Sequence, residues 1–251
     1  MSGVGGANGV PREGGRIRRL AAPPAGIAVG AVLAGVARVR RSRPVHPEGA
    51  VYAGRLVVHG SGDAPEATVL GRAAEYRAVV RFSRSLGLPR GLPDLLGMAI
   101  RVEDAYGPGE HQDFLLVTSA DLPVVHHVFL PAGDVQQRPY TSAAPYRAGG
   151  RRFVVGALPR EDSPRPEGGD ELERLAGAAA TGRLGFDIGV ARLMGRFEVV
   201  GRLEIGRRVP PAAEAIRFHP ANCGGGLEPF GMINRMRDFA YPASQRAWPA
   251  G

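Results

Sequence analysis

Short runs of β-forming residues, separated by turn residues, fill most of the stretch from residue 51 to 117 and constrain the fold more than any other feature. Four such runs are rich in Val, Leu and Phe: Val51–His59, Ala78–Ser83, Met98–Val102 and Gln112–Val117. Runs of this length and composition are typical of strands. Because many short strands must bury their apolar faces against one another, the pattern predicts a closed antiparallel barrel with accompanying helices.

A further strand is expected near residue 200, where apolar and charged residues alternate. The apolar face consists of Phe197, Val199, Leu203 and Ile205, and the charged face of Arg196, Glu198, Arg202 and Glu204. A period of two residues predicts a half-buried antiparallel strand.

Two helices and one long loop are expected elsewhere in the chain. Residues 168–182 read GGDELERLAGAAATG, which predicts a helix with Asp170 as its N-cap. Residues 27–41 are expected to form a second helix. Residues 132–168 are rich in Gly, Pro, Ser and Arg, and this composition predicts a long surface connection.

The composition excludes several kinds of chemistry. All 32 basic residues are Arg, so a Schiff-base lysine and a lysine-bearing phosphate loop are excluded. Cys223 is the only cysteine. An intrachain disulfide is therefore excluded, as are thiolate-based zinc and iron–sulfur sites.

The positive charge is concentrated at the N-terminus. Residues 1–43 contain eight Arg and a single acid, Glu13, whereas residues 44–251 are almost neutral. We therefore divide the chain into a basic extension, 1–43, and a folded domain, 44–251. A basic arm can contact a membrane surface weakly or bind nucleic acid, but a solvated extension without a partner is the favoured interpretation. The near-neutral domain shows no nucleic-acid module.

The extension also bears on localisation. The apolar run from Gly26 to Ala37 is shorter than the roughly 20 residues that span a bilayer. Flanked by Arg18 and Arg19, it resembles the apolar part of an export signal. A helix that packs on the folded domain is the preferred alternative, so the protein is expected in the cytoplasm. The oligomeric state is left open.

One pair of residues near the C-terminus points to a specific chemistry. A last helix is expected to begin near Phe230 and to carry Ile233, Arg237 and Tyr241 on one face. A guanidinium held beside a phenol favours the phenolate. Tyrosine is one of the residues that hold haem iron. For the pair alone, a Tyr that packs under an Arg on an ordinary helix remains the alternative.

Three segments around this pair resemble the haem catalases in the order in which that family has them. The first is RPVHPEGAVYAG, with Arg43 and His46; the second is VVRFS, followed by GMAIRV and QDFLL. The third is FHPANCGGGLEPFGMINRMRDFAYPASQR, which ends with the ligand motif around Tyr241. The resemblance implies an eight-stranded barrel with haem b bound beside it.

The same resemblance implies a role for each matching residue. Tyr241 would be the axial ligand of the iron, with Arg237 stabilising its phenolate. His46 would be the distal acid–base group, and the Ser83 hydroxyl would fix its tautomer. The arginines that would bind the haem propionates are Arg43 and Arg81. The family also has an Arg seven residues after the ligand Tyr; this chain has Trp248 there, and Arg246 is the nearby residue that could substitute as a cofactor-binding group.

The chain departs from the catalase pattern at the distal side. Catalases use an Asn shortly after the QDFLL segment, but Val117, Thr118 or Ser119 falls there. Losing one distal hydrogen-bond donor costs a few kcal/mol of transition-state stabilisation. We therefore expect a haem oxidoreductase that processes hydrogen peroxide or an organic hydroperoxide, with rapid dismutation in doubt. A non-catalytic haem carrier or sensor and a hydroperoxide isomerase are the alternatives.

Overall fold

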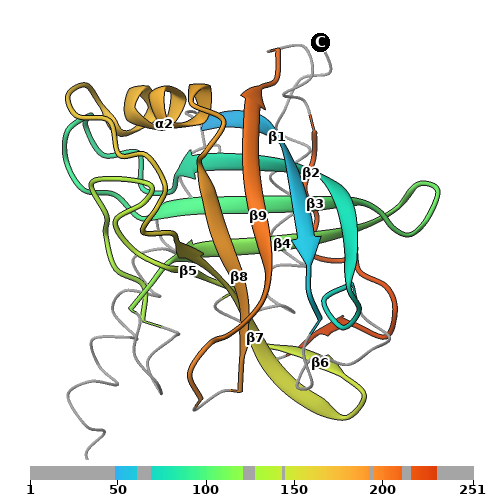
Figure 1. Cartoon of the computed structure of the whole chain (residues 1–251). Coiled ribbons are helices and arrows are strands. Elements are labelled where there is room, and N and C mark those ends of the chain that lie inside the picture. The colour runs from blue at the N-terminus through green and yellow to red at the C-terminus, as the bar shows by residue number, and fades with distance from the viewer. Residues whose placement is uncertain are drawn as a thin grey trace, which may run out of the picture.

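Ten strands and one helix make up the regular structure of the described residues, which are 49–60, 69–120, 128–142, 145–192, 195–210 and 216–230 in this computed structural model. The helix, α2, spans Glu171–Ala180 (Figure 1). The strands are β1 (Gly49–Val58), β2 (Ala74–Arg84), β3 (Leu96–Gly107), β4 (Glu110–Thr118), β5 (Tyr140–Thr141), β6 (Tyr146–Ala148), β7 (Arg151–Pro159), β8 (Gly185–Ala191), β9 (Glu198–Arg208) and β10 (Glu228–Pro229).

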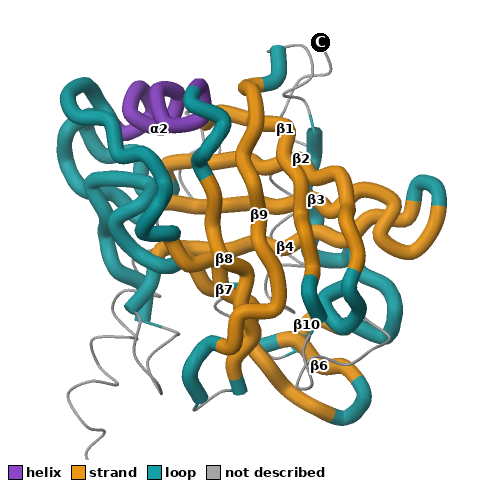
Figure 2. The backbone as a smooth tube through the Cα atoms, in the orientation of Figure 1, coloured by secondary structure: helices purple, strands orange, loops and turns teal. Residues whose placement is uncertain are grey.

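Eight of these strands close into an antiparallel barrel. The order β5-β4-β3-β2-β1-β9-β8 is completed by β7, which pairs with both β8 and β5. Figure 2 shows β8 and β9 crossing over β2, β3 and β4, as the two sides of a barrel do. The strands β6 and β10 extend β7 beyond the barrel. The expectation of a closed barrel of about eight antiparallel strands is confirmed.

The interior of the barrel is filled by large side chains. Tyr52, Phe82, Tyr140 and Phe186 are almost fully buried, and the ring centroids that contact each other lie 6.0–6.5 Å apart. Most of these rings meet edge to face, which suits their quadrupoles. Because aromatic and aliphatic groups occupy the interior, a large ligand must bind outside the barrel.

The four strands expected between residues 51 and 117 correspond to β1–β4; β2, β3 and β4 extend beyond both expected ends, whereas β1 begins two residues earlier and ends one residue earlier than expected. The expectation of a surface loop over 132–168 is wrong, because β5, β6 and β7 lie there. Phe153, Val155 and Ala157 of β7 point into the main core. The prediction failed because Arg151, Arg152 and the Gly residues of this stretch are typical of a loop, whereas β7 is a central strand of the barrel.

The alternation near residue 200 is only partly as expected. Leu203 and Ile205 are buried, but Val199 is 49% exposed. In the pairing with β8, Ile188 lies opposite Gly201 and Gly189 opposite Val199, so Val200 is an extra residue. Such a β-bulge moves the preceding residues to the other face. The prediction that Phe197 and Val199 share a face with Leu203 is therefore wrong.

The helix predicted around Asp170 is confirmed. The Asp170 carboxylate accepts hydrogen bonds from the amides of Leu172 and Glu173, and the Glu173 carboxylate accepts one from the Asp170 amide. These bonds form a capping box. The hydrogen bond from the Glu173 amide lowers the pKa of Asp170. Leu175 and Ala178 of α2 are buried, and the helix lies across one end of the barrel (Figure 1).

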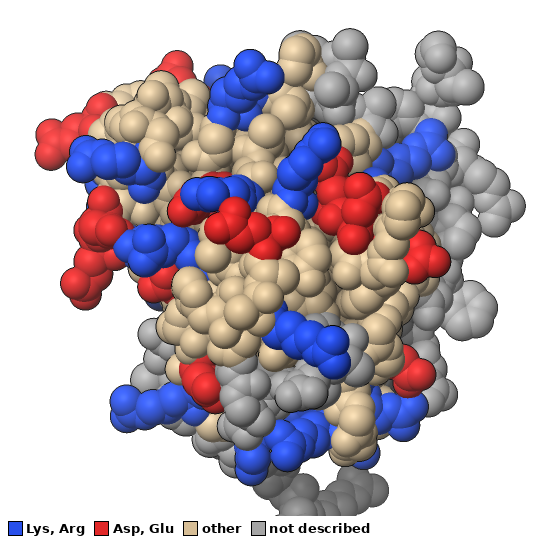
Figure 3. Space-filling view, turned by 45° about the vertical axis from the view of Figure 1, so that its right-hand side comes forward, with Lys and Arg blue, Asp and Glu red and all other residues tan. Residues whose placement is uncertain are grey.

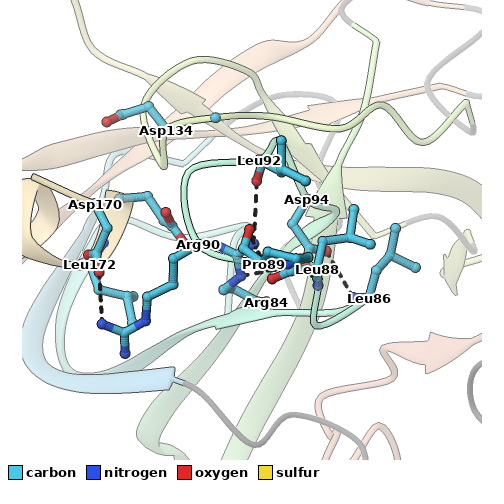
Figure 4. A network of polar contacts seen from close by, with 12 residues as sticks. Arg84, Leu86, Leu88, Pro89, Arg90, Leu92, Asp94, Asp134, Asp170 and Leu172 are labelled. Atoms are coloured by element: carbon cyan, nitrogen blue, oxygen red, sulfur yellow. Dashed lines mark hydrogen bonds and ion pairs between the residues drawn. The ribbon is translucent and has the colours of Figure 1, made fainter.

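A buried ionic cluster lies beneath α2 (Figure 4). Arg84, at the end of β2, forms ion pairs with Asp94 and with Glu171 of α2, and all three side chains are almost completely buried. Arg84 also donates to backbone carbonyls of the loop that follows, whereas Asp94 accepts from the Leu86 and Leu88 amides. The cluster thereby joins β2, this loop and the helix.

Two predicted helices, 27–41 and the one expected after Phe230, lie outside the described residues, as does the proposed boundary at residue 43. Within the described part of the chain, no helix combines the length and the apolar character needed to cross a membrane.

Candidate functional site

Alternate residues of β2 point out of the barrel and form one side of the candidate site. Val80 and Phe82 belong to the inner core, so Val79, Arg81 and Ser83 lie on the outer side. The structure thus places two of the predicted site residues, Arg81 and Ser83, on one face of one strand.

Small and apolar residues surround Arg81 and Ser83 on the neighbouring strands. Arg81 lies between Val51 of β1 and Ala99 of β3 in the pairing register. Ser83 lies between Gly49 and Gly97. The residues paired with Ser83 therefore carry no side chain, and those paired with Arg81 are apolar.

The same strands carry charged residues towards their other ends. Arg55 forms ion pairs with Glu75 and Glu204, and Arg77 pairs with Glu103. Figure 3 shows basic and acidic side chains side by side on one face of the molecule. The outer wall formed by β1–β3 thus changes from a solvated, charged half to an apolar half.

The Ser83 side chain packs directly on β3. A Cβ added to Gly97 would lie 2.9 Å from Ser83 Oγ, closer than side-chain carbons approach. Ser83 is 7% exposed, and its hydroxyl makes no hydrogen bond to any other residue that the structure describes. A nearly buried hydroxyl of this kind is suited to binding a further polar group.

The Arg81 guanidinium lies over β1 near the same end of the barrel. Its Nη2 atom is 3.1 Å from the position that a Cβ on Gly49 would take. Arg81 is half-buried. A guanidinium at this position can bind a carboxylate through two parallel hydrogen bonds.

The segment 216–230, which precedes the predicted ligand helix, lies against this outer wall. Phe218 packs on Val51 and Val79, with Ile216 and Leu115 beside them. Farther along, Leu227 is buried in the main core, and the Tyr106 ring packs against the backbone at Gly224. The FHPAN motif is thus held on the barrel by both apolar and polar contacts.

The polar contacts centre on an ion pair that the sequence analysis missed. Arg101 of β3 donates two hydrogen bonds to Asp113 of β4, Nε to Oδ1 at 2.8 Å and Nη2 to Oδ2 at 2.7 Å. The Asp113 carboxylate raises the pKa of Arg101, so the guanidinium stays charged. The available signal was a pair of charged residues within the otherwise apolar GMAIRV and QDFLL segments.

A second set of contacts holds the end of this segment. The Phe230 ring lies below two guanidinium groups, 4.3 Å from Arg152 Cζ and 5.6 Å from Arg147 Cζ. Its amide donates to the carbonyl of Pro145, and Arg147 also pairs with Glu228. The hairpin of β6 and β7 therefore positions the last described residue before the predicted ligand helix.

The three residues near the expected distal Asn differ in their surroundings. Val117 lies on the outer face opposite Gly97 and is half-buried. The Thr118 hydroxyl accepts a hydrogen bond from the Leu96 amide. Ser119 is fully buried, and its hydroxyl has no hydrogen-bond partner within the described ranges. None of the three is an amide like the distal Asn, and the Thr118 and Ser119 hydroxyls are the groups here that can donate a hydrogen bond.

Five predicted site residues lie outside the described part of the chain: Arg43, His46, Arg237, Tyr241 and Arg246. Their roles stay predictions. Among the described residues, no group of three His, Cys, Asp or Glu side chains could hold a metal ion directly.

Comparison with known proteins identifies the fold. No protein-family model matches the chain, and no curated protein matches its sequence. Among solved structures, a fungal catalase superposes with a TM-score of 0.58 at 14% identity, covering 86% of this chain. A bacterial catalase and catalase A from Saccharomyces cerevisiae both give 0.55, at 16% and 11% identity and again over 86% of this chain. The fold is catalase-like. The matched regions span 62%, 60% and 64% of the three catalase chains.

Proposed function

We propose that this chain is a haem-dependent oxidoreductase that processes hydrogen peroxide or an organic hydroperoxide. The observation that carries the proposal is the position of the Ser83 hydroxyl. It lies nearly buried on the outer face of a catalase-like barrel, two residues along β2 from Arg81. The hydroxyl has no hydrogen-bond partner in the described residues, which suits a role in orienting a distal base.

The described residues fit a haem group in three respects. The barrel interior is packed, so a macrocycle has to lie outside it. The residues paired with Ser83, Gly49 and Gly97, add no side chains that would obstruct a planar ring. Arg81 supplies a positive charge for a propionate.

Each residue would have a defined task in the reaction. Haem would supply the redox-active iron that the cleavage of the peroxide O–O bond requires. Tyr241 would hold the group as a phenolate, and Arg237 would stabilise the negative charge on its oxygen. His46 would take the proton from one peroxide oxygen and return it to the leaving oxygen. Ser83 would hold the His46 imidazole in one tautomer and orientation.

The propionates would be bound by Arg43 and Arg81, and Arg246 would contact the cofactor in place of the Arg that the family has seven residues after the ligand Tyr. Arginine suits this task because its planar donors match the two oxygens of a carboxylate. Of these three, Arg81 is the one on the described outer wall.

The proposal is tested by supplying haem to the purified protein and recording its absorption spectrum, followed by a peroxide-consumption assay. Tyr241→Phe should remove the tyrosinate spectrum. His46→Ala should retain bound haem but lower peroxide consumption by roughly 10²–10⁴-fold, the usual effect of removing an acid–base group. His59→Ala, at an exposed position just after β1, is the matched control and should behave as the wild type. A wild-type protein that takes up no haem contradicts the proposal.

A second candidate is a haem-binding protein without turnover. It is favoured by the distal position, where no Asn is present and Val117 is apolar. In that case the wild type would bind haem with a tyrosinate spectrum, and His46→Ala would change neither haem content nor the negligible peroxide consumption.

A further inference from the structure

We propose that Asp113, together with Arg101, is a positioning residue for the haem site, because it fixes residues 217–222 on the outer wall and so determines where the chain that carries Tyr241 begins. This inference rests on the proposed function. It assigns a role to two residues whose side chains are not expected to touch haem or substrate.

The Asp113 carboxylate is the centre of this arrangement. Its side chain is fully buried and accepts four hydrogen bonds, two from Arg101 and two from the FHPAN motif. In that motif, the His219 amide donates to Oδ2 at 2.8 Å and the Asn222 side-chain nitrogen donates to Oδ2 at 2.9 Å. The Asp113 amide also donates to the Asn222 carbonyl at 2.8 Å. One residue of β4 therefore holds both ends of a short loop.

Arg101 holds the same loop from the adjacent strand. Its Nη2 atom donates to the Arg217 carbonyl at 2.7 Å, and its Cζ atom lies 5.4 Å from the centre of the Phe218 ring. Beyond the pair itself, the hydrogen bonds of the two side chains and the ring contact of Arg101 all go to residues 217–222 in the described part of the chain. The pair acts on the loop more than on the barrel.

A comparison with another ion pair on the barrel supports this distinction. Arg55 and Glu204 join β1 to β9, and both side chains are more than 40% exposed. Such a pair only links two strands that their backbone hydrogen bonds already join. Asp113, in contrast, is buried against a segment that is 106–109 residues away in sequence. A buried carboxylate requires partners, so its four donors are fixed in position.

The two ends of the segment are held independently. Asp113 and Arg101 hold its beginning, and the contacts of Phe230 with Arg147 and Arg152 hold its end. Loosening the first anchor should therefore change the position of the segment without releasing it completely. The expected defect is an altered and weakened haem ligation.

The test compares Asp113→Asn with the wild type. Asparagine has nearly the same shape but lacks the charge and replaces one acceptor oxygen with an NH2 group, so Arg101 loses its ion pair and part of the donor set loses its acceptor. We expect amide hydrogen exchange in residues 216–222 of the haem-free protein to rise on the order of tenfold, and the haem dissociation constant to rise by a similar factor, because each charge-assisted bond is worth about one to two factors of ten. The Soret band should shift or broaden.

Two further variants separate positioning from general stability. Arg101→Leu/Asp113→Leu removes both charges and leaves no buried unpaired ion, so the thermal stability of the barrel should recover relative to Asp113→Asn. The haem defect should persist because the loop has still lost its anchor. Asp187→Asn is the matched control, since Asp187 pairs with Arg160 elsewhere on the barrel. It should change neither hydrogen exchange in 216–222 nor haem affinity.

The outcomes distinguish this inference from the proposed function. If the wild type binds haem and Asp113→Asn binds it with unchanged affinity and spectrum, the inference is wrong while the proposed function stands. Recovery of haem ligation in the Arg101→Leu/Asp113→Leu variant would also overturn the inference. The two charges would then only neutralise each other and would not position residues 217–222. If the wild type binds no haem, both fail.

Discussion

The contact between Gly97 and Ser83 leads to a quantitative prediction about the candidate site. Replacing Gly97 with alanine would place a methyl group 2.9 Å from Ser83 Oγ and 3.6 Å from Ser85 Oγ. The first distance is shorter than real Cβ contacts, so either the Ser83 side chain rotates or the strands move apart. Rotation is easier, because it involves one torsion of a short side chain. Gly97→Ala should therefore turn the hydroxyl away from its present position.

The expected magnitudes differ for stability and for catalysis. Overpacking of a buried site costs about 1–3 kcal/mol, and a change that side-chain rotation relieves should fall at the lower end, near 1 kcal/mol. If the Ser83 hydroxyl orients His46, losing that hydrogen bond costs about 1 kcal/mol, which lowers peroxide consumption roughly fivefold. Haem content should stay at the wild-type level.

The assay is a cycle of Gly97→Ala, Ser83→Ala and the double variant, each measured for unfolding free energy and for peroxide consumption with haem bound. Ser83→Ala removes the oxygen that the new methyl group meets, so the double variant should be more stable than the two single effects predict by addition. Gly133→Ala is the control, since its Cβ would meet nothing closer than 3.8 Å. Additive stabilities, or full activity in Ser83→Ala, would refute the reasoning.

Three further predictions concern the scaffold. Arg84→Leu leaves the Glu171 carboxylate buried without its partner, so urea unfolding should show a loss of about 3–5 kcal/mol. Asp170→Asn keeps an N-capping side chain, so stability at neutral pH should change by only a few tenths of a kcal/mol. Because the folded pKa of Asp170 lies below its ordinary value of 3.8, its stabilisation is present above that value and is lost as pH falls through the lowered pKa. Urea titrations at pH 2–5 should therefore show a flatter acid dependence in the variant. Phe197→Ala uncovers the outer face at Gly156 and Gly189, and denaturant unfolding should show a loss of roughly 1–2 kcal/mol.

Local patterns in the sequence were sufficient for the strands whose neighbours in the sheet are also neighbours in the chain. The strands β1–β4 pair in sequence order, and their runs of Val, Leu and Phe mark them clearly. The helix α2 was also predictable, because its N-cap and its capping Glu lie within four residues of each other. In each case the signal and the structure it specifies are local.

The strand β7 was not predictable in the same way. Its stabilisation comes from pairing with β8 and β5 and from burial of Phe153 and Val155. Locally, Arg151, Arg152 and Gly156 resemble a loop. Gly156 is tolerated in this central strand because the Phe197 ring covers it from outside, a contact made possible by the bulge at Val200. The contact between Gly156 and Phe197 cannot be predicted from the sequence around either residue alone.

The residues of the candidate site also differ in whether local sequence was enough to predict them. Arg81 and Ser83 could be identified from a short motif on one strand, whereas Asp113 acquires its role through Asn222, 109 residues away. A carboxylate within a strand is compatible with an exposed position, a cross-strand ion pair or an anchor for a distant loop. Only the folded chain distinguishes among these, because the distinction depends on which segment covers the strand.

The register of β2 connects the packing of the barrel to the chemistry proposed outside it. Val80 and Phe82 fill the interior, and this requirement alone places Val79, Arg81 and Ser83 on the outer wall. A shift of one residue would bury Arg81 among aromatic rings and expose Phe82, at a cost of several kcal/mol for the buried charge. The barrel core therefore selects the register in which Arg81 and Ser83 share the outer face with Val79, the residue of β2 that packs against Phe218. The residues that carry the proposed chemistry need not contribute to stability, because their position is determined by neighbours that do.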